Sequence, residues 1–85
     1  MYQIDAWKRL CWTKIDDAQG QRRFYQVEVK QDLFGAWIVI RSWGRIGHKP
    51  SRVIEVEVQS AEDAQRIVAE TATTRKKHHY LEEDR

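Results

Sequence analysis

The fold is decided by the stretch Phe24-Tyr25-Gln26-Val27-Glu28-Val29-Lys30, along which apolar and polar side chains alternate. A period of two places Tyr25, Val27 and Val29 on one face of a β-strand and the polar residues on the other. A strand with one apolar face needs partners in a sheet and a second layer that covers this face. The stretch therefore predicts a half-buried strand within a two-layer domain.

Three further strands are predicted around this one. The first is rich in aromatic and β-branched residues, the third reads as a more deeply buried strand, and the fourth alternates with Ile54, Val56 and Val58 on one face. The short, turn-rich connections at 16–20 and 31–35 favour an antiparallel meander. The four predicted strands are residues 6–15, 24–30, 37–43 and 53–59.

After the last strand the period changes to that of a helix. Ser60-Ala61-Glu62-Asp63 resembles a capping box in which Ser60 is the N-cap. The apolar residues that follow lie at helical spacing, and Lys76 and Lys77 suit the negative end of the helix dipole. The predicted fold class is α+β, an antiparallel sheet of four or more strands with one α-helix packed on a face. The apolar stripe comprises Ala64, Ile67, Val68 and Ala72.

Length and composition favour a small globular domain spanning residues 1–85. The chain has 85 residues, 15 Lys and Arg against 13 Asp and Glu, and four Trp, which is an unusually high number. The longest apolar run, at 36–40, is far too short to span a membrane, and residues 1–5 contain no secretory pattern. Cys11 is the single cysteine, so no internal disulfide is expected, and a cytoplasmic location, free or associated with the nucleoid, is favoured.

The positive charge is concentrated in the middle of the chain. Residues 31–54 carry Arg41, Arg45, Lys49 and Arg52 against Asp32 alone, a net charge of +3. Residues 1–30 have six basic and four acidic side chains, which gives +2, and residues 55–85 have five and eight, which gives −3. A basic middle third suits an anionic partner.

No catalytic or metal-binding constellation emerges from the sequence. None of the serines lies in a nucleophile motif, and Cys11 is expected to be a buried, inert thiol. His78 and His79 are adjacent, so on a helix they point in different directions and are expected to be solvated. One cysteine and three histidines without paired spacing exclude the usual zinc patterns. No cofactor, no metal and no enzymatic activity are therefore expected.

The candidate binding residues lie between positions 41 and 52. Two glycines allow a ligand to approach the backbone closely, one Trp offers a flat face for stacking, and basic side chains seek phosphate. An ordinary hairpin turn with solvated charges and a core Trp is the alternative interpretation. The candidates in this segment are Arg41, Trp43, Gly44, Arg45, Gly47, His48, Lys49 and Arg52.

The segment Trp43-Gly44-Arg45-Ile46-Gly47 resembles the signature of the WGR domain, which is named for this Trp-Gly-Arg triplet. Arg23-Phe24-Tyr25, the connector at 32–37 and a helix that ends near Tyr80 add to the resemblance, which covers about residues 22–80. The resemblance implies an antiparallel sheet with one helix. In the DNA-dependent poly(ADP-ribose) polymerases this domain binds DNA at strand breaks near the 5′ end, and small stand-alone bacterial versions also exist.

By this resemblance, Trp43 would pack on the sugar or base of a terminal nucleotide, and Arg45 would contact phosphate or a partner domain. Gly44 and Gly47 would hold the turn, and Arg75 would touch backbone phosphate or be a solvated cation at the helix end. The resemblance also assigns a mainly structural role in the core to Phe24, Tyr25 and Trp37.

The chain departs from the family pattern at two places. The family often has Gly where Pro50 stands, so this turn has fewer conformations and one N–H fewer. The family often shows Gly-Tyr where this chain has His79-Tyr80. The geometry of the segment after the helix is therefore left open by the sequence.

The leading hypothesis is a non-catalytic nucleic-acid-binding module that recognises DNA ends or nicks through the Trp-Gly-Arg turn. The alternative is a protein–protein interaction or accessory module that uses the same Trp and Arg surface, since both residue types are favoured anchors of protein interfaces. DNA, or else a partner protein or enzyme, is thus the expected ligand, with no role for a membrane. The sequence leaves the choice between DNA, RNA and protein, and the oligomeric state, open.

Overall fold

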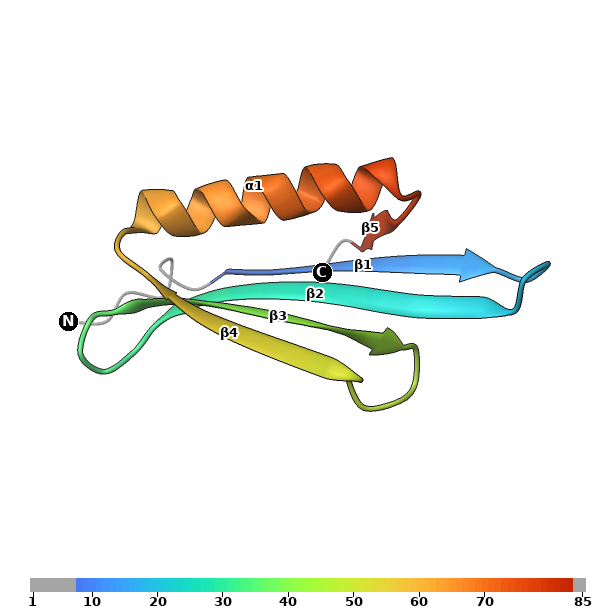
Figure 1. The fold of residues 1–85 in the computed structure, drawn as a ribbon, viewed down its shortest axis with the longest axis horizontal. Coiled ribbons are helices and arrows are strands. Elements are labelled where there is room, and N and C mark those ends of the chain that lie inside the picture. The colour runs from blue at the N-terminus through green and yellow to red at the C-terminus, as the bar shows by residue number, and fades with distance from the viewer. Residues whose placement is uncertain (1–7, 84–85) are drawn as a thin grey trace.

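The computed structural model describes residues 8–83, which form a five-stranded antiparallel sheet with one helix along one face (Figure 1). The strand order is β4-β3-β2-β1-β5, so β2 lies at the centre. This two-layer arrangement confirms the predicted α+β class. The elements are β1 (Lys8–Asp16), β2 (Gln21–Gln31), β3 (Trp37–Arg45), β4 (Arg52–Val58), α1 (Ala61–Lys77) and β5 (Leu81–Glu83).

The alternation in β2 determines which face of the sheet α1 covers. Tyr25, Val27 and Val29 are all buried, as predicted, whereas Gln26 and Glu28 on the other face are only half-buried. Because directly paired residues share a face, the register extends the covered face to the neighbouring strands. Tyr25 thus lies between Trp12 of β1 and Trp43 of β3.

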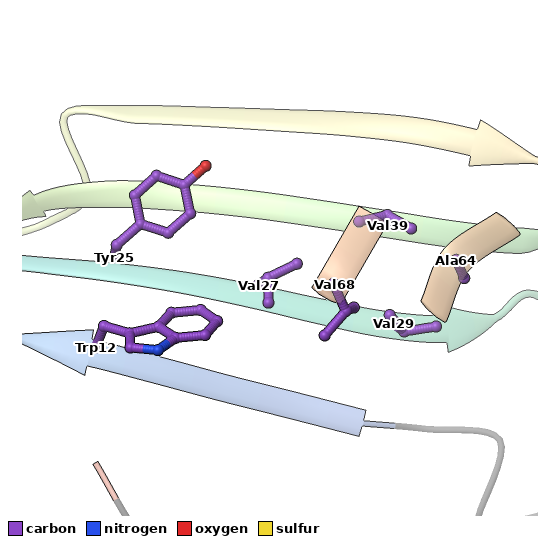
Figure 2. Packing of buried hydrophobic residues seen from close by; sticks show 7 residues of the cluster. All are labelled: Trp12, Tyr25, Val27, Val29, Val39, Ala64 and Val68. Carbon is purple, nitrogen blue, oxygen red and sulfur yellow. The ribbon is translucent and has the colours of Figure 1, made fainter. Parts of the chain in front are cut away.

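The hydrophobic core lies between this face and the apolar stripe of α1. Ala64 and Val68 of the helix pack against valines from β2 and β3, and the side chains converge in Figure 2. Val27 and Val39 each retain only 1% of their exposure, so shortening either would leave a cavity. The seven buried hydrophobic residues are Trp12, Tyr25, Val27, Val29, Val39, Ala64 and Val68.

The predicted helix start is confirmed, and the helix ends earlier than the resemblance implied. Ser60 Oγ accepts a hydrogen bond from the Asp63 N–H at 3.1 Å, which caps the first turn. The helix ends at Lys77, and His79 takes a left-handed backbone conformation with φ of 68°. This reversal turns the chain back to form β5, which pairs with β1.

Three expectations differ from the structure. The strand β5 was not predicted, because three residues carry no periodic signal. Phe24, expected in the core, is half-buried on the face that α1 does not cover, and Ile38 and Ile40 lie on the same face. The deep burial predicted for residues 37–43 is wrong for the same reason, since a single helix covers only one face. Of the predicted first strand, residues 6 and 7, and with them Trp7, lie outside the described residues.

Candidate nucleic-acid interface

The turn between β3 and β4 is held closely against the end of β3. The Ser51 N–H donates to the Trp43 carbonyl at 2.9 Å, and Ser51 Oγ donates to the same oxygen at 3.2 Å. The Ile46 N–H donates to the Arg22 carbonyl at 2.9 Å, which extends the ladder to β2 beyond the end of the strand. Gly47 has φ of 85°, a conformation that glycine adopts without strain. The turn is therefore a defined structure.

Gly44 is required because the turn packs directly on its backbone. A Cβ at this position would lie 2.9 Å from the Ser51 nitrogen and 3.2 Å from the Pro50 Cα. Both neighbours are backbone atoms, so neither can move aside without displacing the turn. The expectation that Gly44 and Gly47 shape the turn thus has a separate physical reason at each residue: close approach at the first and positive φ at the second.

Trp43 is half-buried, and its indole ring is fixed by a stack of aromatic side chains. Its ring lies parallel to that of Tyr25, with centroids 5.3 Å apart and an interplanar angle of 1°. Tyr25 in turn meets Trp12 edge-on at 6.3 Å. Figure 2 shows Trp12 and Tyr25 projecting from neighbouring strands on the covered face. Trp43 is thus anchored to the core on its Tyr25 side and reaches the surface elsewhere.

Beside Trp43 lies an open hollow of about 660 Å³, which we call the basic hollow. Its lining includes residues of the β1–β2 turn and of the β3–β4 hairpin. Both turns lie at the same end of the sheet, at the right of Figure 1. Three arginines and three aromatic residues line the hollow, and glycines and polar residues complete the wall. The lining comprises Arg22, Arg23, Arg45, Phe24, Trp43, Tyr80, Gln19, Gly20, Gln21, Gly44 and Ser51.

The arginines of the basic hollow are exposed and close together. Arg23 and Arg45 are direct partners in the β2–β3 register, and Arg22 adjoins them along β2. None of the three forms an ion pair among residues 8–83, where the recorded pairs join Arg66 to Asp63 and Glu70. Like charges directly opposite each other on a sheet are destabilising, so the two facing guanidinium groups raise the energy of this end of the sheet.

The structure divides the predicted site residues into three groups. Trp43, Gly44 and Arg45 line the basic hollow. Gly47, His48, Lys49 and Arg52 are exposed on the turn and at the start of β4, next to the hollow. The other two predicted residues, Arg41 and Arg75, line a separate groove between α1 and the sheet.

Arg75 is a structural neighbour of the aromatic stack. Its guanidinium carbon lies 4.3 Å from the centroid of the Tyr25 ring and 5.0 Å from that of Tyr80, so the side chain is sandwiched between two rings. Its Nε is buried and has no hydrogen-bond partner among residues 8–83. Cation–π contact with both rings fixes this side chain over the core. Arg75 therefore supports Tyr80, which lines the basic hollow, and does not itself line it.

Sequence reasoning missed Arg22, Arg23 and Tyr80 as members of the site. All three are far from Trp43 in sequence, and only the strand register and the reversal after α1 bring them together. The adjacent basic pair at 22–23, next to the aromatic pair at 24–25, was the one available signal. Within the described part of the chain, no group of three His, Cys, Asp or Glu residues could hold a metal ion.

The comparisons with known proteins establish the family of the chain. The WGR domain family matches residues 9–85, so the chain belongs to this family. The match includes β1 and β5 as well as the segment 22–80 that carries the resemblance. The WGR family is one of nucleic-acid-binding modules, and a WGR domain by itself is non-catalytic.

The chain is also similar to the uncharacterized protein y4dW of Sinorhizobium fredii (strain NBRC 101917 / NGR234), with 31% identity over 72 residues. The aligned region covers 85% of this chain and 35% of that relative, so the chain spans about a third of the length of the longer protein. No solved structure matches significantly. No helix among the described residues is long and apolar enough to cross a membrane.

Proposed function

We propose that this protein binds nucleic acid in the basic hollow without catalysing a reaction, and that it prefers DNA ends or nicks. The observation that carries the proposal is the juxtaposition of Arg23 and Arg45, direct partners in the sheet, beside the anchored ring of Trp43. A phosphate bound between the two guanidinium groups would relieve their repulsion, and arginine binds phosphate bidentately.

The preference for ends follows from what Trp43 can contact. A base inside an intact duplex has neighbours on both faces, whereas a terminal or unstacked nucleotide offers a free face or an accessible sugar. Stacking on an aromatic side chain contributes about 1–3 kcal/mol per base. The half-buried indole beside the hollow suits a terminal nucleotide whose phosphates reach the arginines.

Binding to three duplexes of the same sequence tests this proposal by fluorescence anisotropy. One duplex carries a nick, one has open 5′-phosphorylated ends, and one is closed at both ends by hairpin loops. We expect the nicked and open duplexes to bind more tightly than the closed one. Single-stranded DNA and RNA of the same sequence, measured alongside, establish which nucleic acid is preferred. Equal affinity for all three duplexes would contradict the preference for ends.

Two variants and one control separate the contribution of the Trp43 ring to binding from that of the Arg45 charge. Trp43→Ala is expected to remove the discrimination between open and closed duplexes, and Arg45→Gln to weaken binding to all of them about equally. Arg66→Gln is the matched control, because it removes the same charge from an exposed residue of α1 outside the hollow. Unchanged affinity in both hollow variants would contradict the proposal and would leave protein contact as the role of this surface.

A further inference from the structure

The turn between β2 and β3 exposes two large apolar side chains at the end of the sheet opposite the basic hollow. Leu33 is 99% exposed and Phe34 is 95% exposed. We call this pair the apolar tip. Isolated apolar residues are common on protein surfaces, but two adjacent ones with almost complete exposure are a feature of binding sites. In Figure 1 this turn lies at the left, near the start of α1.

A network of hydrogen bonds holds the apolar tip in one conformation. The Asp32 carboxylate accepts hydrogen bonds from the backbone N–H groups of Phe34 at 2.8 Å and Ala36 at 2.9 Å. The Asp32 N–H donates to the Ala36 carbonyl at 2.9 Å, and the Gln31 side-chain amide donates to the Gly35 carbonyl at 2.9 Å. A partner of this preorganised turn would lose little affinity to ordering it.

The apolar tip adjoins a second open hollow, of about 780 Å³, on the face of the sheet that α1 leaves uncovered. Leu33 and Ile38 contribute apolar walls, and Glu55 contributes a carboxylate. In the β3–β4 register Ile38 pairs with Glu57, and Ile40 pairs with Glu55. We call the surface formed by Leu33, Phe34, Ile38, Glu55 and Glu57 the acidic tip surface.

The charges of this surface select its partner. Glu55 and Glu57 are exposed, and neither forms an ion pair within the part of the chain that the structure describes. Among the described residues, Lys30 is the one cation that lines this hollow, against the carboxylates of Asp32 and Glu55. Nucleic acid and anionic lipid are repelled by such a surface, whereas a basic protein segment is attracted.

We propose that the acidic tip surface binds a protein segment whose apolar side chains are flanked by lysine or arginine. The partner packs its apolar side chains on Leu33, Phe34 and Ile38 and places its basic residues next to Glu55 and Glu57. Along β2, six residue steps separate Phe24 in the basic hollow from Lys30 in the hollow beside the apolar tip, about 20 Å at roughly 3.3 Å per residue. Nucleic acid and the protein partner can therefore be bound at the same time. The proposal for this surface does not depend on the proposed nucleic-acid site.

The test uses a synthetic amphipathic helical peptide with leucines along one face and lysines along the other. Titrated into the ¹⁵N-labelled protein, it is expected to shift the amide resonances of residues 30–40 and 53–58 and to leave those of 45–52 unchanged. The same peptide with glutamate in place of lysine is expected to bind at least about tenfold more weakly. Shifts centred on residues 45–52, or equal binding of both peptides, would overturn the proposal.

Two double variants identify the contacts. L33S with F34S removes the apolar tip, and E55Q with E57Q removes the acidic side chains; each is expected to weaken binding about tenfold or more. All four side chains are exposed, so the thermal unfolding midpoint should change little, and this is checked for each protein. L81S is the control outside the surface, because Leu81 of β5 is another exposed leucine. Unchanged peptide affinity in the first double variant would overturn the proposal.

Two other possible occupants of this surface are a second copy of the chain and a lipid surface. The wild-type protein and the L33S with F34S variant distinguish them from a basic protein segment. Sedimentation equilibrium of the wild type tests whether a second copy of the chain binds, and vesicles of phosphatidylcholine test whether a lipid surface does. Self-association or vesicle binding that is lost in L33S with F34S would overturn the assignment to a basic protein segment. The assignment is supported if the wild-type protein is monomeric, does not bind the vesicles and binds the lysine peptide.

Discussion

At the scale of single residues, the departure from the family pattern at His79 acquires a structural meaning. After α1 the His79 N–H donates to the Lys76 carbonyl at 3.0 Å, and the Tyr80 N–H donates to the Arg75 carbonyl at 2.9 Å. This pair of bonds, with a left-handed residue between the helix and Tyr80, is a Schellman motif. The position normally suits glycine, which explains why the family often has Gly there.

His79→Gly is therefore expected to stabilise the protein by about 0.5–1 kcal/mol, because it removes the steric cost of a side chain at positive φ. The measurement is the free energy of unfolding from urea denaturation. His78→Gly is the control, since His78 has φ of −92° and gains nothing from glycine. A His79→Gly protein no more stable than the wild type would contradict this account.

At the scale of elements, the β3–β4 hairpin depends on how closely its turn approaches β3. Gly44→Ala is expected to destabilise the protein by about 1–3 kcal/mol, because the added Cβ would overlap backbone atoms of the turn. It is also expected to weaken nucleic-acid binding by moving Arg45 and Trp43. Urea denaturation and anisotropy measure the two effects.

Gly47→Asn is the control for this prediction. No heavy atom lies within 4 Å of a Cβ at Gly47, and asparagine tolerates positive φ better than most residues. The variant should lose less stability than Gly44→Ala. The reverse order would contradict the close approach of the turn as the reason for glycine at position 44.

Local periodicity was sufficient to predict most of the elements. Tyr25, Val27 and Val29 indicated the covered face, and Ser60 indicated the start of α1, because both signals lie within a few neighbouring residues. The uncovered position of Phe24 was missed because its core role came from the family resemblance, although the period places it on the face opposite Tyr25. The strand β5 was missed because it depends on a single reversal at His79.

The candidate site was predictable only in part, because the register between β2 and β3 brings together residues that are far apart in the sequence. The turn residues Trp43, Gly44 and Arg45 form a contiguous motif that the sequence displays directly. The pairing of Arg23 with Arg45 is a long-range property of the sheet, and no local pattern shows it. Arg41 was grouped with the turn because it is near in sequence, yet it lines a different groove.

At the scale of the whole molecule, a net charge of +2 conceals two ends of opposite character. Basic residues gather around the hollow, and acidic residues gather around the apolar tip and the start of α1. A polyanion bound in the hollow, as proposed, should have an affinity that falls with salt at the shallow slope of a few phosphate contacts.

With about three to five phosphate contacts, the logarithm of the association constant for duplex DNA should fall with that of the salt concentration at a slope of about −3 to −5. Anisotropy titrations at several salt concentrations measure the slope. Arg45→Gln is expected to reduce its magnitude by about one, and Arg66→Gln should leave it unchanged. A slope near zero would contradict electrostatic binding in the hollow.

The position of β4 at the edge of the described sheet has a consequence for solubility. A seven-residue strand with Val53, Ile54, Val56 and Val58 and an unpaired outer edge is a template for edge-to-edge aggregation with another copy. Glu55 and Glu57 interrupt this apolar run, and carboxylates on an exposed edge disfavour the pairing of identical strands. The same two glutamates thus lower the tendency of this edge to pair with a second copy of the chain.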